Sequence, residues 1–122
     1  MHFGERKSRV DAAVGPSEVK RLDRYNGRWL FYVRAGIYVG YYAHRGSKYV
    51  FAIGTHSPRY ETRSGICVGS TLRQLRKRIK VTCNLASDGT CQTVPANHNH
   101  PFTVFHIDGK RVAEVDVFPG GD

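Results

Sequence analysis

Histidines are the residues of this 122-residue chain best placed to bind a metal ion. His98 and His100 alternate in the stretch NHNH before Pro101, and His106 follows a few residues later. Alternating residues of an extended segment point to the same side, and imidazoles bind Zn²⁺ or Cu²⁺. An Asn-rich turn before proline is also a common loop. Because the sequence offers no obvious third ligand, we expect no metal site and no cofactor.

The cysteines suggest a disulfide rather than catalysis. Cys83 and Cys91 enclose the polar loop CNLASDGTC, and a bond between them would staple this loop, as is typical of oxidising compartments. The three cysteines include no C-x-x-C pair, which disfavours zinc. Cys67 lies between Ile66 and Val68, which favours a buried thiol over a nucleophile.

The acidic and hydroxyl residues show no catalytic pattern. Asp and Glu total 10, and no carboxylate pair has a distinctive setting, although Glu114 and Asp116 point to the same side of an expected strand. No nucleophile-elbow context surrounds Ser17, Ser57, Ser64 or Ser70. We therefore expect that the protein is not an enzyme.

The densest positive charge lies in residues 66–80, ICVGSTLRQLRKRIK, within a chain of net charge +9. Leu72, Leu75 and Ile79 form an apolar stripe at helical spacing. The basic residues are Arg73, Arg76, Lys77, Arg78 and Lys80. They are either the solvated back of a helix, which we favour, or an anion-binding site for nucleic acid or an anionic surface. No zinc-finger, helix-turn-helix or RNA-recognition signature supports base readout.

The stretch HFGERKSRVDAAVG, residues 2–15, repeats the skeleton of this basic segment. At equal spacing, Gly4 aligns with Gly69, Val10 with Leu75, and Val14 with Ile79. We expect a short helix just after each glycine, with Ser70 as the N-cap of the second helix and Gly15-Pro16 ending the first.

Strand patterns follow each helix. EVKRLDRY and RWLFYV are joined by Asn26-Gly27, a strong hairpin signal, and IYVGYY and KYVFAIGT come next. After the second helix we expect about three strands, the last two joined at Asp108-Gly109. The prediction is an α+β fold of two tandem helix-plus-antiparallel-meander units, 1–56 and 57–122. They would form one curved sheet with both helices on one face.

Aromatic and arginine residues crowd the strands of the first unit. Both faces of these strands carry rings, whereas a helix covers only one face, so we expect an exposed recognition face with Tyr32, Tyr38 and Tyr42 on it. Cross-strand pairing that only stabilises the sheet is the alternative. The predicted partner-binding residues are Trp29, Tyr32, Tyr38, Tyr42, Tyr49, Arg28 and Arg34.

The motif GERKSRVDAAVGP resembles the opening of small bacterial envelope domains, which include the SmpA/BamE-type outer-membrane lipoproteins and the β-lactamase inhibitory proteins. RYETRSGICVGSTLRQLRKRI is similar to a pattern of small secreted bacterial proteins. The resemblance implies two tandem units whose sheets form a concave protein-binding surface. The second unit departs from the motif, because RIKVTC stands where Gly-x-Pro would close the helix.

These observations together predict a secreted or envelope-associated, non-catalytic protein-binding module with an inhibitory or assembly role. Its arginines would attract an acidic partner. The alternative is electrostatic binding of nucleic acid or an anionic surface through the second helix. The chain shows no signal peptide and no apolar run near the ~20 residues that span a bilayer.

Overall fold

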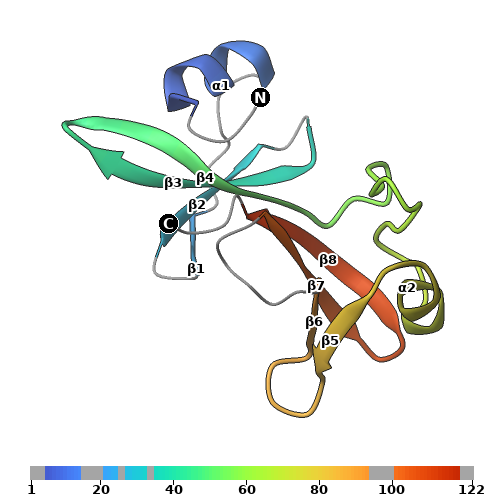
Figure 1. The fold of residues 1–122 in the computed structure, drawn as a ribbon. Coiled ribbons are helices and arrows are strands. Elements are labelled where there is room, and N and C mark those ends of the chain that lie inside the picture. The colour runs from blue at the N-terminus through green and yellow to red at the C-terminus, as the bar shows by residue number, and fades with distance from the viewer. Residues whose placement is uncertain (1–4, 15–20, 25–26, 33–34, 94–100, 119–122) are drawn as a thin grey trace. The chain divides into compact units, whose positions relative to one another are not determined.

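The computed structural model describes residues 5–14, 21–24, 27–32, 35–93 and 101–118. The chain divides into two compact units, Met1–Gly54 and Thr55–Asp122, whereas the sequence suggested a boundary after residue 56. Within the described residues each unit consists of one short helix and four antiparallel strands, which confirms the α+β class and the repeated element order (Figure 1). The expected joining into one curved sheet concerns the relation between the units and stays a prediction.

The first unit is a helix followed by a β-meander. Helix α1 spans Lys7–Val14, and strands β1 to β4 span Arg21–Arg24, Gly27–Tyr32, Ile37–His44 and Ser47–Thr55. The strands pair in chain order, β1-β2-β3-β4. The β3–β4 hairpin turns through Arg45 and Gly46, both with positive φ (51° and 79°), as a two-residue turn with the twist of the strands requires. The predicted meander is therefore confirmed.

The second unit has one strand more than the sequence suggested. Helix α2 spans Leu72–Arg78, and strands β5 to β8 span Val81–Asn84, Thr90–Thr93, Phe102–Asp108 and Arg111–Phe118. They pair in the order β8-β7-β6-β5. The segment VTCNLASDGTCQT folds back on itself, with Gly89 at φ 66°, and so makes the separate hairpin β5–β6.

The N-cap of α2 is Thr71 rather than Ser70. The Gln74 backbone N–H donates to Thr71 Oγ1 over 3.1 Å, and the Thr71 backbone N–H donates to Gln74 Oε1 over 2.8 Å. This reciprocal capping box satisfies two helix-end donors at once. Ser70 serves the preceding turn instead, because its Oγ accepts the Cys67 backbone N–H over 3.0 Å.

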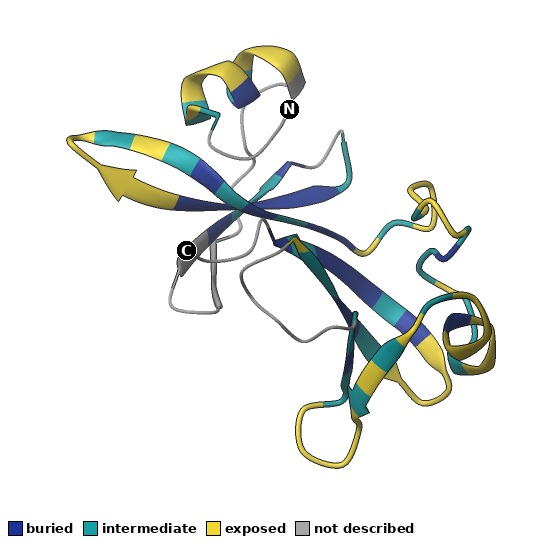
Figure 2. Cartoon of the chain, in the orientation of Figure 1, coloured by how far each residue is buried: buried dark blue, intermediate teal, exposed yellow. Residues whose placement is uncertain are grey.

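Each unit encloses its own apolar core beneath its helix. Val10 of α1 and Leu75 of α2, which align in the sequence repeat, are both fully buried. Figure 2 shows that each helix has a buried, dark blue position in a surface that is mostly exposed. The first core contains Val10, Tyr32, Ile37, Val39, Tyr41 and Val50. The second contains Ile66, Leu75, Cys91, Phe105, Val112 and Val115. Val10 and the stripe of α2, formed by Leu72, Leu75 and Ile79, therefore face the cores, as burial of apolar surface favours, whereas the side chain of Val14 lies outside the described residues.

Trp29 anchors the first sheet by packing over a glycine. It is 1% exposed, it faces Gly40 across β2 and β3, and its ring meets Phe51 edge-on at 5.8 Å between centroids. A Cβ at Gly40 would lie 2.9 Å from the Phe51 ring and 3.1 Å from the Trp29 ring. Glycine is therefore required at this position to make room for both rings.

Candidate functional sites

Three of the predicted partner-binding aromatic residues are buried, so the expectation that Tyr32 and Tyr38 are exposed is wrong. Trp29 and Tyr32 are each 1% exposed and Tyr38 is 8% exposed. Tyr38 packs against Phe31 with 4.6 Å between ring centroids. These rings stabilise the sheet, which is the cross-strand alternative. Arg34 and the side chain of Arg28 lie outside the described residues.

Tyr32 is buried because α1 supplies a partner for its polar tip. The Tyr32 hydroxyl donates to Asp11 Oδ1 over 2.7 Å and accepts from the Tyr41 hydroxyl at 2.6 Å. Lys7 Nζ completes the network with an ion pair to Asp11 Oδ2 at 2.6 Å. Burial raises the pKa of Tyr41 to about 12 and that of Tyr32 further still. Both hydroxyls therefore stay protonated and act as structural donors.

The exposed aromatic surface of the first unit lies near the β3–β4 turn. Tyr42 is 46% exposed and stacks on Tyr49, with 5.6 Å between centroids. The Arg6 guanidinium lies 5.9 Å from the Tyr49 centroid, within cation–π range, and the His44 ring lies 6.5 Å from it. We call Arg6, Tyr42, His44 and Tyr49 the hairpin patch. Tyr42 and Tyr49 were predicted for binding, whereas Arg6 and His44 were not.

The backbone holds the hairpin patch together. Tyr42 and His44 alternate along β3 and therefore lie on one face. Arg6 forms an antiparallel bridge with Tyr49, and the Val50 N–H donates to the Glu5 carbonyl over 2.9 Å. The segment before α1 thus carries a cation to the tyrosine pair, a contact that sequence spacing gives no means of predicting.

The basic residues of α2 and its end, Arg73, Arg76, Lys77, Arg78 and Lys80, are all exposed. Arg78 donates to the Gly65 carbonyl over 3.3 Å, which ties the end of the helix to the preceding loop. The repeated stretch is thus a helix with an apolar stripe on the core and its cations outside. Its capacity to bind anions stays a prediction.

The cysteines are arranged as a disulfide and a separate thiol. Cys83 and Cys91 are cross-strand partners in β5 and β6 and are joined by a disulfide. Cys67 is free and half-buried, so the expected burial of its thiol is only partial. Its Sγ lies 3.8 Å from Ser70 Oγ, at the long limit for a hydrogen bond to sulfur.

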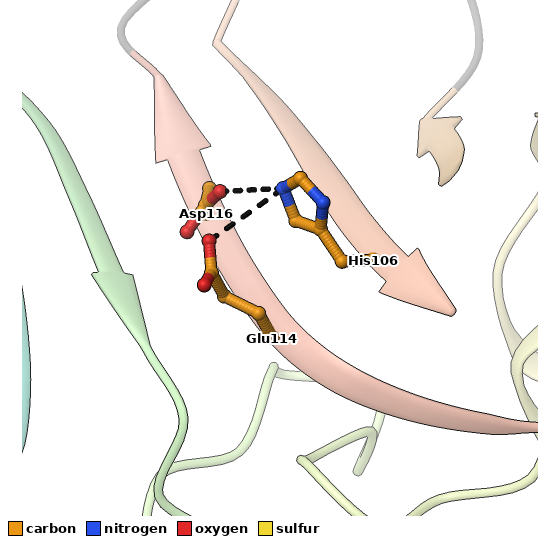
Figure 3. A group of neighbouring side chains, drawn as sticks. All are labelled: His106, Glu114 and Asp116. Carbon is orange, nitrogen blue, oxygen red and sulfur yellow. Dashed lines mark hydrogen bonds and ion pairs between the residues drawn. The ribbon is translucent and has the colours of Figure 1, made fainter. Parts of the chain in front are cut away.

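A cluster of one histidine and two carboxylates in the second unit was not predicted. We call His106, Glu114 and Asp116 the His–carboxylate cluster; Figure 3 shows His106 on β7 and both carboxylates on β8. His106 Nε2 lies 2.8 Å from Asp116 Oδ2 and 3.5 Å from Glu114 Oε2. His56 also bonds to this cluster, through its Nε2 and Glu114 Oε1.

Strand geometry explains how the cluster forms. Glu114 and Asp116 lie two residues apart on β8 and so share a face, and His106 is the cross-strand partner of Glu114. The sequence showed that the two carboxylates point together, but it did not give the strand register. The hairpin signal at Asp108-Gly109 indicates that β7 and β8 pair, but a β-bulge between His106 and Ile107 shifts the register, so only the structure places His106 opposite Glu114. His98 and His100, weighed earlier as metal ligands, lie outside the described residues.

Burial dominates the electrostatics of the cluster. The Glu114 and Asp116 side chains are 3% and 0% exposed, whereas those of His106 and His56 are 28% and 46% exposed. Desolvation raises the pKa of Asp116 from its usual 3.8 to about 7, and the Glu114 carboxylate acts in the same direction. The hydrogen bond from His106 opposes this shift. Ionisation of Asp116 at this buried position is therefore costly without a cation beside it.

Because the pKa of Asp116 is raised, we expect the free energy of unfolding of Asp116→Asn to increase relative to that of the wild type as the pH rises from 4 to 7. In this window the unfolded carboxyl is ionised while the folded one keeps its proton, so the wild type loses stability with rising pH. The loss is at most about 1.4 kcal/mol per pH unit, because a single carboxyl releases at most one proton on unfolding.

Urea unfolding followed by circular dichroism at pH 4, 5.5 and 7, with a chelator present, measures this difference. Asp88→Asn is the matched control, because it removes an exposed carboxylate of the same unit. A stability difference between Asp116→Asn and the wild type that stays constant across these pH values would contradict the raised pKa.

Comparison of the chain with known proteins and structures identifies no relative. The chain matches no protein-family model, no curated protein and no solved structure. The resemblance to small bacterial envelope domains therefore stays a prediction. Neither helix in the described part of the chain has the length and apolar character needed to cross a membrane.

Proposed function

We propose that this protein is a non-catalytic protein-binding module that binds an acidic segment of a partner through the hairpin patch. The observation that carries the proposal is the exposed Tyr42 ring stacked on Tyr49, with the Arg6 guanidinium over the Tyr49 ring. Tyrosine and arginine supply large contact areas with polar tips and dominate the energetics of protein interfaces. The patch is smaller than the face predicted from sequence, because Trp29, Tyr32 and Tyr38 belong to the fold.

The positive charge of the protein favours an acidic partner. Arg45 and Lys48 are exposed at and beside the β3–β4 turn, close in sequence to the patch, and the chain carries a net charge of +9. Such a field would mainly speed association, while the tyrosines would govern dissociation. The disulfide Cys83–Cys91 is compatible with a secreted or envelope location, where an inhibitory or assembly role would be exercised.

A second candidate function is electrostatic binding of nucleic acid or an anionic surface through α2. It is favoured by the exposure of every basic residue of that segment and by the lack of acidic residues in the first turn of the helix. The two functions differ in their salt dependence. Phosphate binding weakens steeply with salt through counterion release, whereas recognition centred on aromatic rings does not.

Replacing Tyr42 with alanine is expected to weaken partner binding about 5- to 30-fold, a loss of about 1–2 kcal/mol, because an exposed stacked ring is removed from the patch. The partner is first recovered from the envelope fraction of the host with the wild-type chain as bait. Its affinity for each variant is then measured by surface plasmon resonance at low and high salt.

The matched control is Tyr60→Ala. Tyr60 is 37% exposed and its ring also lies beside an arginine, Arg59, at 5.2 Å, but it belongs to the second unit. Unchanged affinity for Tyr42→Ala would refute the proposal. Steep salt dependence, with loss of binding on charge reversal at Arg76 and Lys77, would establish the second candidate instead.

A further inference from the structure

We propose that the His–carboxylate cluster is a binding site for a divalent transition-metal cation of the Zn²⁺ class. The donor set contains one imidazole nitrogen and two carboxylates, from His106, Glu114 and Asp116, whose ligand atoms all lie within 4.8 Å of one another. Imidazole and carboxylate are the usual nitrogen and oxygen ligands of Zn²⁺. This proposal is independent of the hairpin patch and of the function proposed for it.

The spacing of the donor atoms fits a small cation. Ligands at ~2.1 Å from a tetrahedral Zn²⁺ lie roughly 3.4 Å from one another. His106 Nε2 lies 2.8 Å from one carboxylate oxygen and 3.5 Å from the other, so the observed separations bracket this value. The cation would lie between the imidazole and the carboxylates. Without the cation, the hydrogen-bonding proton between His106 and Asp116 lies there. Small side-chain shifts suffice to admit the cation.

Burial distinguishes this cluster from the acidic groups common on protein surfaces. The Glu114 and Asp116 side chains are nearly inaccessible, yet their oxygens lie together in surroundings of low dielectric. Two such carboxylates repel each other when both are ionised. A divalent cation between them attracts both, and this attraction outweighs their mutual repulsion. The partly exposed side chain of His106 leaves the cluster a route from solvent. A water molecule would complete a four-coordinate site, as in open zinc sites.

His56 would act as a positioning residue for the Glu114 carboxylate. Its Nε2 bonds to Glu114 Oε1, while Glu114 Oε2 faces His106. Hydrogen bonds of this kind orient a ligating carboxylate, and their loss typically weakens metal binding 10- to 100-fold. The imidazole in the donor set also selects the class of metal. Mg²⁺ and Ca²⁺ prefer all-oxygen sites, so neither is expected to compete well.

Calorimetric titration of the full, oxidised chain with Zn²⁺ at pH 7.5 tests the proposal. We expect one Zn²⁺ per chain, at least tenfold weaker binding for both His106→Gln and Asp116→Asn, and no comparable binding of Mg²⁺. Bound Zn²⁺ should also raise the melting temperature of the wild type, because it binds only the folded site. Circular dichroism in chelator checks that each variant is folded.

Two control variants separate the cluster from the other histidines. The double variant His98→Gln/His100→Gln removes the pair weighed from the sequence, and His44→Gln removes an exposed histidine of the first unit. Both should bind Zn²⁺ as the wild type does. Loss of binding in the double variant, with retention in Asp116→Asn, would overturn the proposal.

A measurement on the wild type alone keeps the proposal testable if the cluster variants fail to fold. Long-range proton–nitrogen spectra of the imidazole rings report Zn²⁺ binding directly. The His106 Nε2 resonance should shift on titration, and the His44 resonances should stay in place. An unshifted His106 resonance at saturating Zn²⁺ would refute the assignment, as would the absence of any heat of binding.

Discussion

Replacing Trp29 with alanine is expected to lower the free energy of unfolding by about 3–5 kcal/mol, the usual cost of removing a large buried aromatic ring. Trp29 is 1% exposed and packs against Phe51 and over Gly40. Truncation would leave a cavity over Gly40 and beside Phe51 that the remaining groups cannot fill, since Gly40 has no side chain to close it. The effect is on folding and not on a binding surface.

Urea unfolding followed by far-ultraviolet circular dichroism measures this loss. Fluorescence is unsuitable, because Trp29 is the single tryptophan of the chain and the variant has no reporter. Tyr42→Ala is the matched control, since it removes a ring from the same sheet at an exposed position and should change stability by about 0.5 kcal/mol or less. A loss below ~1 kcal/mol for Trp29→Ala would place the ring outside the core.

The second large effect is expected at Leu75 of α2, where alanine should destabilise the protein by about 2–5 kcal/mol. Leu75 is fully buried in the core of the second unit, among residues that include Phe105 and Val112. Alanine has a high helix propensity, so the helix itself is not penalised. The loss therefore measures how strongly α2 is held by its apolar side.

Variants on the opposite side of the same helix provide the control. Arg76 and Lys77 are exposed neighbours of Leu75, and replacing both with alanine is expected to change the free energy of unfolding by about 0.5 kcal/mol or less. The measurement is again urea unfolding by circular dichroism. Comparable losses for Leu75→Ala and the double variant would mean that the basic face carries packing, contrary to its exposure.

Trp29→Ala and its control Tyr42→Ala separate folding from recognition among aromatic residues of one sheet. Trp29 and Tyr42 were assigned to one binding face, yet only Tyr42 is exposed. The two variants should therefore affect different properties: Trp29→Ala should lower stability, whereas Tyr42→Ala should weaken partner binding. Binding experiments on this protein need stability measurements beside them, because a buried ring can mimic a hot spot when its loss unfolds the binding unit.

The amino-acid sequence by itself determined the local elements and their repetition. Equal spacing predicted that Val10 and Leu75 face a core, and both are fully buried. The positions of most strands and the pairing of Cys83 with Cys91 were also predicted. These features depend on the periods of helix and strand and on short loops, so nearby residues suffice to specify them. The hairpin β5–β6 was missed, because its two strands span only four residues each.

Only the tertiary structure decided which polar side chains are buried and what they meet. Tyr32 is buried because Asp11 of α1 accepts its hydroxyl, and Arg6 joins the hairpin patch because the segment before α1 pairs with β4. His106 meets Glu114 and Asp116 because strand register brings them together. A buried polar group requires a partner, and that partner comes from another element of the chain. Alternation along a single strand cannot identify that partner, and for this reason the His–carboxylate cluster and the Arg6 contact of the hairpin patch emerged only from the fold.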